Sequence, residues 1–172
     1  MKHALLCTEQ GIPQGTSNVD YAHAAPGKLH RAFSIFIFRN NYTELLIQKR
    51  TDGKRFGGLW ANTCCSHLQE NEDLIAAAEK RLKEECGFTC PLTEHSSFIY
   101  RANDPTGDAV EYEFDSILIG DFTNPNLNPD PTEISELKWI NIDKLTNEIE
   151  NNPEKFAPWL PIALDRILSI EI

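Results

Sequence analysis

The sequence predicts a mixed α/β fold, formed by a single domain that covers residues 1–172. Segments with the apolar pattern of β-strands are interspersed with segments whose apolar side chains recur at helical spacing, and this mixture is typical of an α/β architecture. The chain length and its 41% of hydrophobic residues suit one core, and no clear domain boundary interrupts the sequence.

The strands are predicted from alternating or continuous apolar runs. The first covers residues 31–38, and a turn at 40–41 leads to a returning strand at 44–48, which together predict a hairpin. A glycine-rich basic loop follows at 52–58, and Trp60 begins ordered structure again. Further strands are predicted at 97–100, 109–119 and 137–140.

A helix is predicted from Asn71 to Cys86. Asn71 is a suitable N-cap, and Gly87 stands where a helix ends. One face of this helix is apolar and is formed by Leu74, Ala78 and Leu82. Another face carries Arg81, Glu84 and Glu85, which project together at i+3 and i+4 spacing. Two more helices are predicted near 143–151 and 159–168.

The charge of the chain excludes one class of partner and favours another. A net charge of −10 argues against a nucleic-acid-binding protein, because a phosphate backbone requires a basic face. Residues 28–55 nevertheless hold seven basic side chains against two acidic ones. Such a patch suits a small anionic ligand, although solvated strand edges and a turn would give the same pattern.

Apolar runs and cysteines indicate the cellular environment. No apolar run approaches the ~18 residues that span a bilayer, and the amino terminus has too short an apolar stretch for a signal peptide. We therefore expect a cytoplasmic protein with no membrane partner. The five cysteines are odd in number and form no paired CxxC motif, so we expect reduced thiols.

The helix predicted at 71–86 carries acidic residues at a characteristic spacing. The positions that match the Nudix box, a motif of metal–diphosphate sites, are Glu72, Leu82, Glu84, Glu85, Gly87 and Phe88. Carboxylates on successive turns can together hold a hard cation that bridges diphosphate oxygens. Ser66 stands at the first glycine of the box, and Lys80 and Arg81 replace its Arg-Glu pair. An ordinary charged helix explains the same residues, and the basic Arg81 weakens a hydrolase function.

Three histidines and two glutamates form a candidate metal site. His23 and His30 flank a Pro-Gly turn, and His67 follows a pair of cysteines. Glu111 and Glu113 lie two apart on a predicted strand, so that both carboxylates point to the same face. If that face meets the imidazoles, an N3O2 or N3O3 site suits a divalent transition metal or Mg2+. For any one histidine, an ordinary structural role is the commoner fate.

Cys65 is the candidate reactive thiol. In an extended chain adjacent side chains face opposite ways, so only one of Cys64 and Cys65 can face the site. Cys65 shares a face with His67 and is favoured for this reason. A buried apolar filler is the alternative, because most free cysteines are of that kind.

Together these residues resemble the type I isopentenyl-diphosphate isomerases, a metal-dependent family with a Nudix fold. The resemblance runs from His23 to the region of Trp159. Its motifs are Leu29-His30-Arg31-Ala32-Phe33-Ser34, Arg50 with Lys54, Asn62-Thr63-Cys64-Cys65-Ser66-His67, Glu84-Glu85-Cys86-Gly87, Tyr100-Arg101-Ala102-Asn103-Asp104-Pro105, Glu111-Tyr112-Glu113 and Pro158-Trp159. It implies an α/β/α sandwich with a mixed sheet, and interconversion of isopentenyl and dimethylallyl diphosphates.

The resemblance also implies a role for each residue of the site. The residues that would hold one divalent metal, Mn2+, Zn2+ or Mg2+, are His23, His30, His67, Glu111 and Glu113. Glu85 would help to hold Mg2+ on the substrate diphosphate, which would be contacted by Arg50, Lys54 and Arg81. Cys65 and Glu113 would be the acid/base pair, with Tyr100 assisting the carboxylate. Trp159 would face a carbocation, although packing of a C-terminal helix is its ordinary role.

Some positions depart from the family pattern. Gly57, Ala61 and Leu68 replace residues common in the family, and residues 19–21 lack the basic side chain that often precedes the first histidine. A Nudix pyrophosphohydrolase is the enzymatic alternative, and a metal-stabilised binding module is the non-enzymatic one. The expected partner is a small isoprenoid diphosphate. The sequence leaves open the oligomeric state, the metal, and which of Cys65 and Glu113 donates the proton.

Overall fold

The computed structural model describes residues 3–123 and 126–169. Over these residues the elements follow in the order β1 (His3–Cys7), β2 (Pro13–Asn18), α1 (Val19–His23), β3 (His30–Arg39), β4 (Glu44–Arg50), β5 (Trp60–Ala61), β6 (Cys64–His67), α2 (Leu74–Cys86), β7 (Thr93–Asn103), β8 (Val110–Asp121), β9 (Ile134–Asn141), α3 (Ile142–Asn151), a 3-10 turn at Pro153–Lys155, and α4 (Trp159–Ser169).

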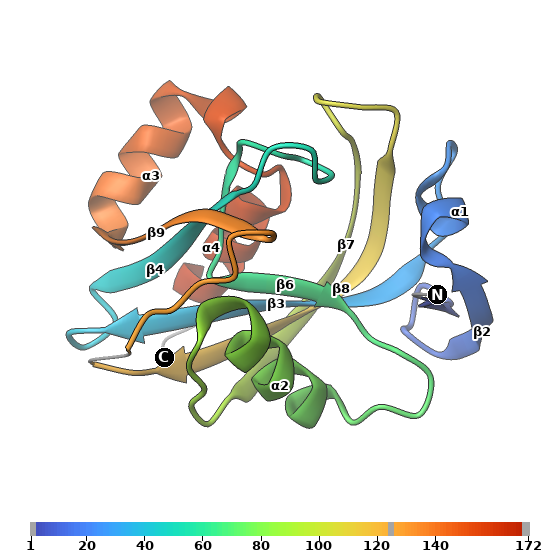
Figure 1. Cartoon of the computed structure of the whole chain (residues 1–172), viewed down its shortest axis with the longest axis horizontal. Coiled ribbons are helices and arrows are strands. Elements are labelled where there is room, and N and C mark those ends of the chain that lie inside the picture. The colour runs from blue at the N-terminus through green and yellow to red at the C-terminus, as the bar shows by residue number, and fades with distance from the viewer. Residues whose placement is uncertain (1–2, 124–125, 170–172) are drawn as a thin grey trace.

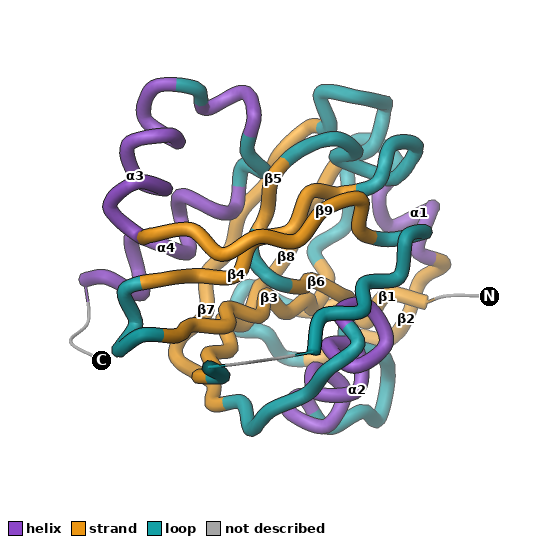
Figure 2. The backbone as a smooth tube through the Cα atoms, turned by 60° about the vertical axis from the view of Figure 1, so that its left-hand side comes forward, coloured by secondary structure: helices purple, strands orange, loops and turns teal. Residues whose placement is uncertain are grey.

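Strand β3 is the centre of the sheet (Figure 2). It runs parallel to β8 in a register that pairs His30 with Glu113 and Phe38 with Asp121. Along its other edge it is antiparallel to β6, where Ala32 pairs with His67, and to the start of β4. The mixed sheet that was predicted is completed by the antiparallel pairs β7–β8, β9–β4, β5–β4, β1–β3 and β1–β2.

Helices cover both faces of this sheet (Figure 1). Phe36 and Phe38 of β3 belong to the apolar cluster that includes residues of α3 and α4, whereas Phe33, Ile35 and Ile37 belong to the cluster that includes residues of α2. These alternating side chains are at most 2% exposed. Burial of each of these side chains contributes about 1.5–3 kcal/mol to folding. Because the side chains pack into both clusters, β3 joins the two halves of the α/β/α sandwich.

Helix α2 ends as predicted but begins later. Asp73, and not Asn71, is its N-cap, because the Asp73 carboxylate accepts a hydrogen bond from the main-chain N–H of Ala76 at 3.0 Å. Asn71 lies in the left-handed region at φ 64°, so the predicted N-cap was wrong. Gly87 ends the helix at φ 84°, which is the left-handed conformation that glycine adopts without strain.

Several short elements were not predicted. They are β1, β2, α1, β5, β6 and the 3-10 turn, although ordered structure was expected to resume at Trp60. The predicted strands and the two C-terminal helices are all present with extended or shifted ends. All five cysteines are free, as expected. Within residues 3–123 and 126–169, no helix has the length and apolar character needed to cross a membrane.

Candidate active site

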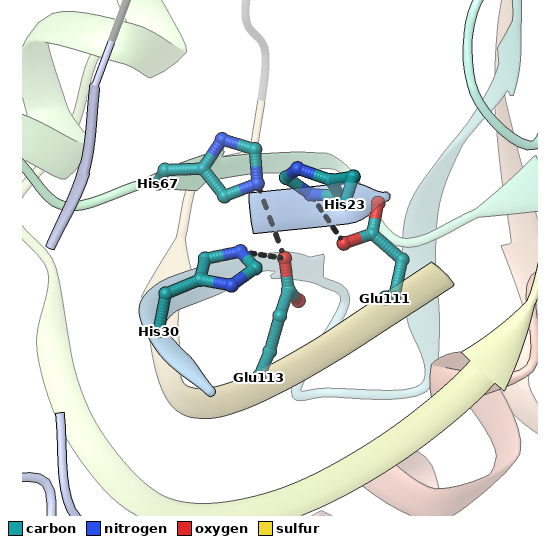
Figure 3. A group of neighbouring side chains, drawn as sticks. All are labelled: His23, His30, His67, Glu111 and Glu113. Carbon is teal, nitrogen blue, oxygen red and sulfur yellow. Dashed lines mark ion pairs between the residues drawn. The ribbon is translucent and has the colours of Figure 1, made fainter. Parts of the chain in front are cut away.

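Five residues converge where α1, β3, β6 and β8 meet (Figure 3). They come from the end of α1, the first residue of β3, the last of β6, and two alternate positions of β8: His23, His30, His67, Glu111 and Glu113. One potential ligand atom from each lies within 4.8 Å of all the others. Four of these side chains are buried, and His67 is partly exposed.

Hydrogen bonds fix the orientation of two of the imidazoles. The Nδ1 atom of His23 lies 2.6 Å from the carbonyl of Val19, and that of His30 lies 2.7 Å from the carbonyl of Lys28. Because a carbonyl only accepts, each Nδ1 carries the proton and each Nε2 faces the cluster.

The buried atoms of this cluster lack ordinary partners. Neither Nε2 of His23 nor Nε2 of His30 has a hydrogen-bond partner among the described residues, and the same holds for Oε2 of Glu111. His23 Nε2 nevertheless lies 2.8 Å from Glu111 Oε2. Buried polar atoms without partners are costly, and here they are the nitrogen and oxygen donors that divalent metals prefer. The five residues therefore fit a divalent metal ion.

Glu113 lies between the histidines and a tyrosine. Its Oε1 is 3.4 Å from His30 Nε2 and 3.2 Å from His67 Nε2. Its Oε2 accepts a hydrogen bond of 2.6 Å from the Tyr100 hydroxyl. Burial opposes ionisation of Glu113, but the contacts with His30 and His67 outweigh it and lower the pKa of this carboxyl well below its usual range. Burial and the charge of Glu113 raise the pKa of Tyr100, which keeps its proton.

Cys65 and Glu113 line one small cavity of about 50 Å³ together with Tyr100 and Trp159. Cys64 points away from it, into the core beside α2. The Cys65 thiol donates to Asn62 Oδ1 at 3.0 Å. Burial raises the pKa of Cys65 to about 12, against the opposing charge of Arg50, so the thiol is protonated at neutral pH.

Trp159 forms an aromatic wall of the small cavity. The indole is 3% exposed, at the start of α4. Its ring lies against Phe56 and Tyr100, with centroids 5.2 and 5.8 Å apart. The guanidinium carbon of Arg50 lies 5.7 Å from the indole centroid. The electron-rich faces of such rings stabilise nearby positive charge.

A larger cavity of about 610 Å³ adjoins the small one, because both are lined by Arg50, Arg55, Cys65, Ser66 and His67. The residues expected to bind diphosphate, Arg50, Lys54 and Arg81, all line the larger cavity, and so does Glu85. Arg81 Nε contacts Glu85 Oε1 at 2.6 Å. A chamber lined by both cations and carboxylates thus lies beside the cavity of Cys65 and Glu113.

Two residues of the site, Glu133 and Asn62, were not predicted to have a role. Glu133 contacts both Lys54 and Arg81, at 3.0 and 3.4 Å. Asn62 receives hydrogen bonds from Cys65 and Trp159. Glu133 lies far from both cations in the sequence, and Asn62 was noted only as part of a motif. Only the tertiary structure shows what these two side chains contact.

Comparison with protein families identifies a match over most of the chain. The sequence pattern of the NUDIX domain family matches residues 28–160. Among curated proteins, the "Isopentenyl-diphosphate Delta-isomerase" of Nocardia farcinica is 42% identical over 161 residues, which cover 93% of this chain and 91% of that protein. "Isopentenyl-diphosphate Delta-isomerase 2" of Photorhabdus laumondii is 49% identical, over 77% of this chain and 74% of that protein.

Solved structures show the same fold at low sequence identity. A crystal structure of a protein from Deinococcus radiodurans superposes with a TM-score of 0.76 at 17% identity, covering 96% of this chain and 98% of that one. The MutT protein from Methanosarcina mazei superposes with a TM-score of 0.67 at 14% identity, covering 82% and 94%. At this identity the likeness shows the fold alone, and it agrees with the predicted sandwich.

Proposed function

This chain belongs to the isopentenyl-diphosphate Delta-isomerases of the NUDIX family, and we propose on that basis that it interconverts isopentenyl and dimethylallyl diphosphates. The observation that carries the proposal is the small cavity in which a thiol and a carboxylate line the walls beside an indole. Moving a double bond requires one group that gives a proton and another that takes one. Diphosphate hydrolysis requires no such pair.

Cys65 and Glu113 are the proposed acid and base. The thiol proton of Cys65 goes to the terminal alkene carbon, and the π electrons form the new C–H bond, which leaves a tertiary carbocation. Glu113 removes a proton from the methylene next to the cation, and those electrons form the new double bond. Tyr100 donates to Glu113 Oε2 and thus holds the carboxylate in place. General acid/base catalysis of this kind contributes roughly 10²- to 10⁴-fold per group.

Trp159 is the proposed wall for the carbocation. Its ring lines the cavity shared by Cys65 and Glu113, and it is held by its contacts with Phe56 and Tyr100. A cation–π contact in a dehydrated site contributes about 2 kcal/mol or more, and an indole does not capture the cation as water would.

His23, His30, His67, Glu111 and Glu113 would hold a divalent metal, with Mn2+, Zn2+ and Mg2+ as the candidates. When bound, the ion supplies positive charge that keeps the imidazoles neutral and the carboxylates ionised. The chain itself prepares the site, because the main-chain carbonyls of Val19 and Lys28 hold two of the rings.

The larger cavity would bind the diphosphate of the substrate. Arg50, Lys54 and Arg81 supply the positive charge, and Glu85 supplies a carboxylate that would help to hold Mg2+. The ion would neutralise part of the diphosphate charge. Arg81 stands where the Nudix box has an acid, which fits an enzyme that binds a diphosphate and leaves it intact.

One experiment separates this function from hydrolysis. The purified protein is incubated with isopentenyl diphosphate, Mg2+ and Mn2+, and NMR spectra of the products are recorded. We expect dimethylallyl diphosphate without release of phosphate. Release of phosphate from an unrearranged C5 chain would identify a pyrophosphohydrolase instead.

A further inference from the structure

Asn62 is a fully buried amide between two residues of the proposed chemistry. Its Oδ1 accepts hydrogen bonds from the Cys65 thiol at 3.0 Å and from Trp159 Nε1 at 2.9 Å. Its Nδ2 donates to the main-chain carbonyls of Ile35 at 3.0 Å and Cys64 at 2.9 Å. The two donors and two acceptor positions of the amide are thereby all used.

These partners fix the orientation of the amide. A carbonyl only accepts a hydrogen bond and an indole N–H only donates one. If the Asn62 amide were turned over, its NH2 would face the N–H of Trp159, and its oxygen would face two carbonyls. Each buried polar group left without a partner is costly, so the Asn62 oxygen points toward Cys65 and Trp159 before any substrate binds.

We propose that Asn62 is a positioning residue, which holds the Cys65 thiol and the Trp159 indole in a fixed mutual arrangement for the isomerisation. Cys65 and Trp159 line the small cavity with Glu113, whereas Asn62 lines neither this cavity nor the larger one. Asn62 therefore acts through its two partners and not on the substrate. The inference rests on the proposed function.

The structure indicates why such a link is needed. Cys65 belongs to β6 and Trp159 opens α4, so the proton donor and the aromatic wall come from distant parts of the chain. The bond between Asn62 and Trp159 spans 97 residues of sequence. Misplacement of a reacting group by about 1 Å can lower a rate about 10²-fold. Loss of the link should therefore lower the rate of the chemical step and leave diphosphate binding intact.

The first test compares Asn62→Ala and Asn62→Ser with Thr63→Val. Thr63 is the matched control, because it is the next residue and is equally buried. Its hydroxyl accepts a hydrogen bond from the main-chain N–H of Ile37 and donates one to the carbonyl of Leu46, so it contacts neither Cys65 nor Trp159. We expect both Asn62 variants to lose about 10- to 100-fold in kcat with a KM within about twofold of wild type. Thr63→Val should keep the wild-type kcat even where its Tm falls.

The second test follows the indole N–H of Trp159 by 15N NMR in the substrate-free protein, with Trp159→Phe used to assign the signal. We expect its chemical shift to move and its hydrogen exchange to accelerate in the Asn62 variants, and both to remain unchanged in Thr63→Val. This readout does not depend on activity. Two Asn62 variants are used because one substitution can prevent folding.

The outcomes separate the two proposals. A wild-type protein that moves no double bond contradicts the proposed function. An active wild type whose Asn62 variants keep its kcat, or lose no more than Thr63→Val, contradicts the positioning role alone. An indole signal that stays unchanged in the Asn62 variants contradicts it as well.

Discussion

The hydroxyl of Tyr100 donates a hydrogen bond of 2.6 Å to Oε2 of Glu113, on the carboxylate oxygen that the histidines leave open. His30 and His67 contact Oε1. The two oxygens of one carboxylate are thus held from two sides, by imidazoles of the candidate metal site and by the phenol of Tyr100, which pairs with Glu113 in the β7–β8 register.

Removal of this hydroxyl is expected to slow the isomerisation. Tyr100→Phe should lower kcat roughly 10- to 100-fold, because a hydrogen bond to a charged group contributes about 1.5–3 kcal/mol. The KM should change little, since the cations of the larger cavity are untouched. Tyr112→Phe, on the neighbouring strand β8 and outside both cavities, is the control and should remain fully active. Equal kcat values for Tyr100→Phe and wild type would contradict the role given to Tyr100.

Replacement of Cys65 tests its proposed role as the proton donor. Cys65→Ala should lose at least about 10²-fold in isomerase activity while it retains the bound metal, because Cys65 is not one of the metal-site residues. Cys90→Ala removes a buried thiol elsewhere and should stay active. Kinetic assays and elemental analysis of each purified variant provide the measurement. A Cys65→Ala enzyme with wild-type turnover would exclude this thiol as a catalytic group.

Much of the fold could be predicted because its central elements carry strong local patterns. The apolar run in β3 and the Gly87 C-cap are visible in the sequence itself. The β6 strand was missed because Cys-Cys-Ser-His has no apolar alternation, and pairing with β3 makes this segment a strand. The β2 strand was missed because Pro13–Asn18 is largely exposed and polar. Asn71 was mistaken for the N-cap because either polar residue could cap the helix, and only the backbone conformation distinguishes them.

Part of the candidate site could likewise be predicted from the sequence, and part could not. The metal-site residues and Cys65 belong to types that attract attention in any sequence, and the family resemblance gave each a role. The contacts of Asn62, Ser34 and Asp115 could not be foreseen. Ser34 donates to Asp115 at 2.7 Å, a contact between positions 81 apart in sequence, and Ser34 and Asp115 occupy adjacent strands. The contact between Ser34 and Asp115 follows from sheet register, and that between Asn62 and Trp159 from the tertiary placement of α4; local patterns specify neither.

The raised pKa of Cys65 predicts slow alkylation at neutral pH. With a pKa of about 12, the thiolate fraction at pH 8 is about 10⁻⁴, and it increases tenfold with each pH unit until the pKa is approached. Mass spectrometry after iodoacetamide treatment between pH 7 and 10 measures the modification of Cys65, with a cysteine peptide as the reference. A modification rate equal to that of the peptide at pH 7 would contradict a protonated, partly buried thiol.

Loss of one imidazole is expected to remove the metal. His67→Ala should bind the ion much more weakly and lose activity, whereas His95→Ala, outside the cluster, should keep both. A metal that binds only the folded state stabilises it by RT ln(1 + [metal]/Kd), about 2.7 kcal/mol at 100 times the Kd. Addition of metal should therefore raise the Tm of wild type and His95→Ala but not of His67→Ala. An equal rise in all three would place the metal elsewhere.

Substitution of Gly87 by alanine is expected to lower the free energy of unfolding. A Cβ at this position would lie 2.7 Å from both Cβ and the carbonyl oxygen of Asn128, at a φ of 84°. Gly53 has the same φ, but no atom lies within 4 Å of a Cβ built there. Gly53→Ala should therefore lose about 1 kcal/mol through its backbone conformation, and Gly87→Ala clearly more. Urea unfolding of both variants measures the difference, and equal losses would show that the contact with Asn128 relaxes freely.

Deuterium incorporation from heavy water tests the central claim most directly. Wild-type protein is incubated with isopentenyl diphosphate in D2O, and the C5 diphosphates are analysed by NMR, with Cys65→Ala and Glu113→Gln in parallel. We expect deuterium in the new methyl group of dimethylallyl diphosphate from wild type, and neither product nor label from the two variants. A rearranged product without deuterium, or full labelling by both variants, would contradict proton transfer by Cys65 and Glu113.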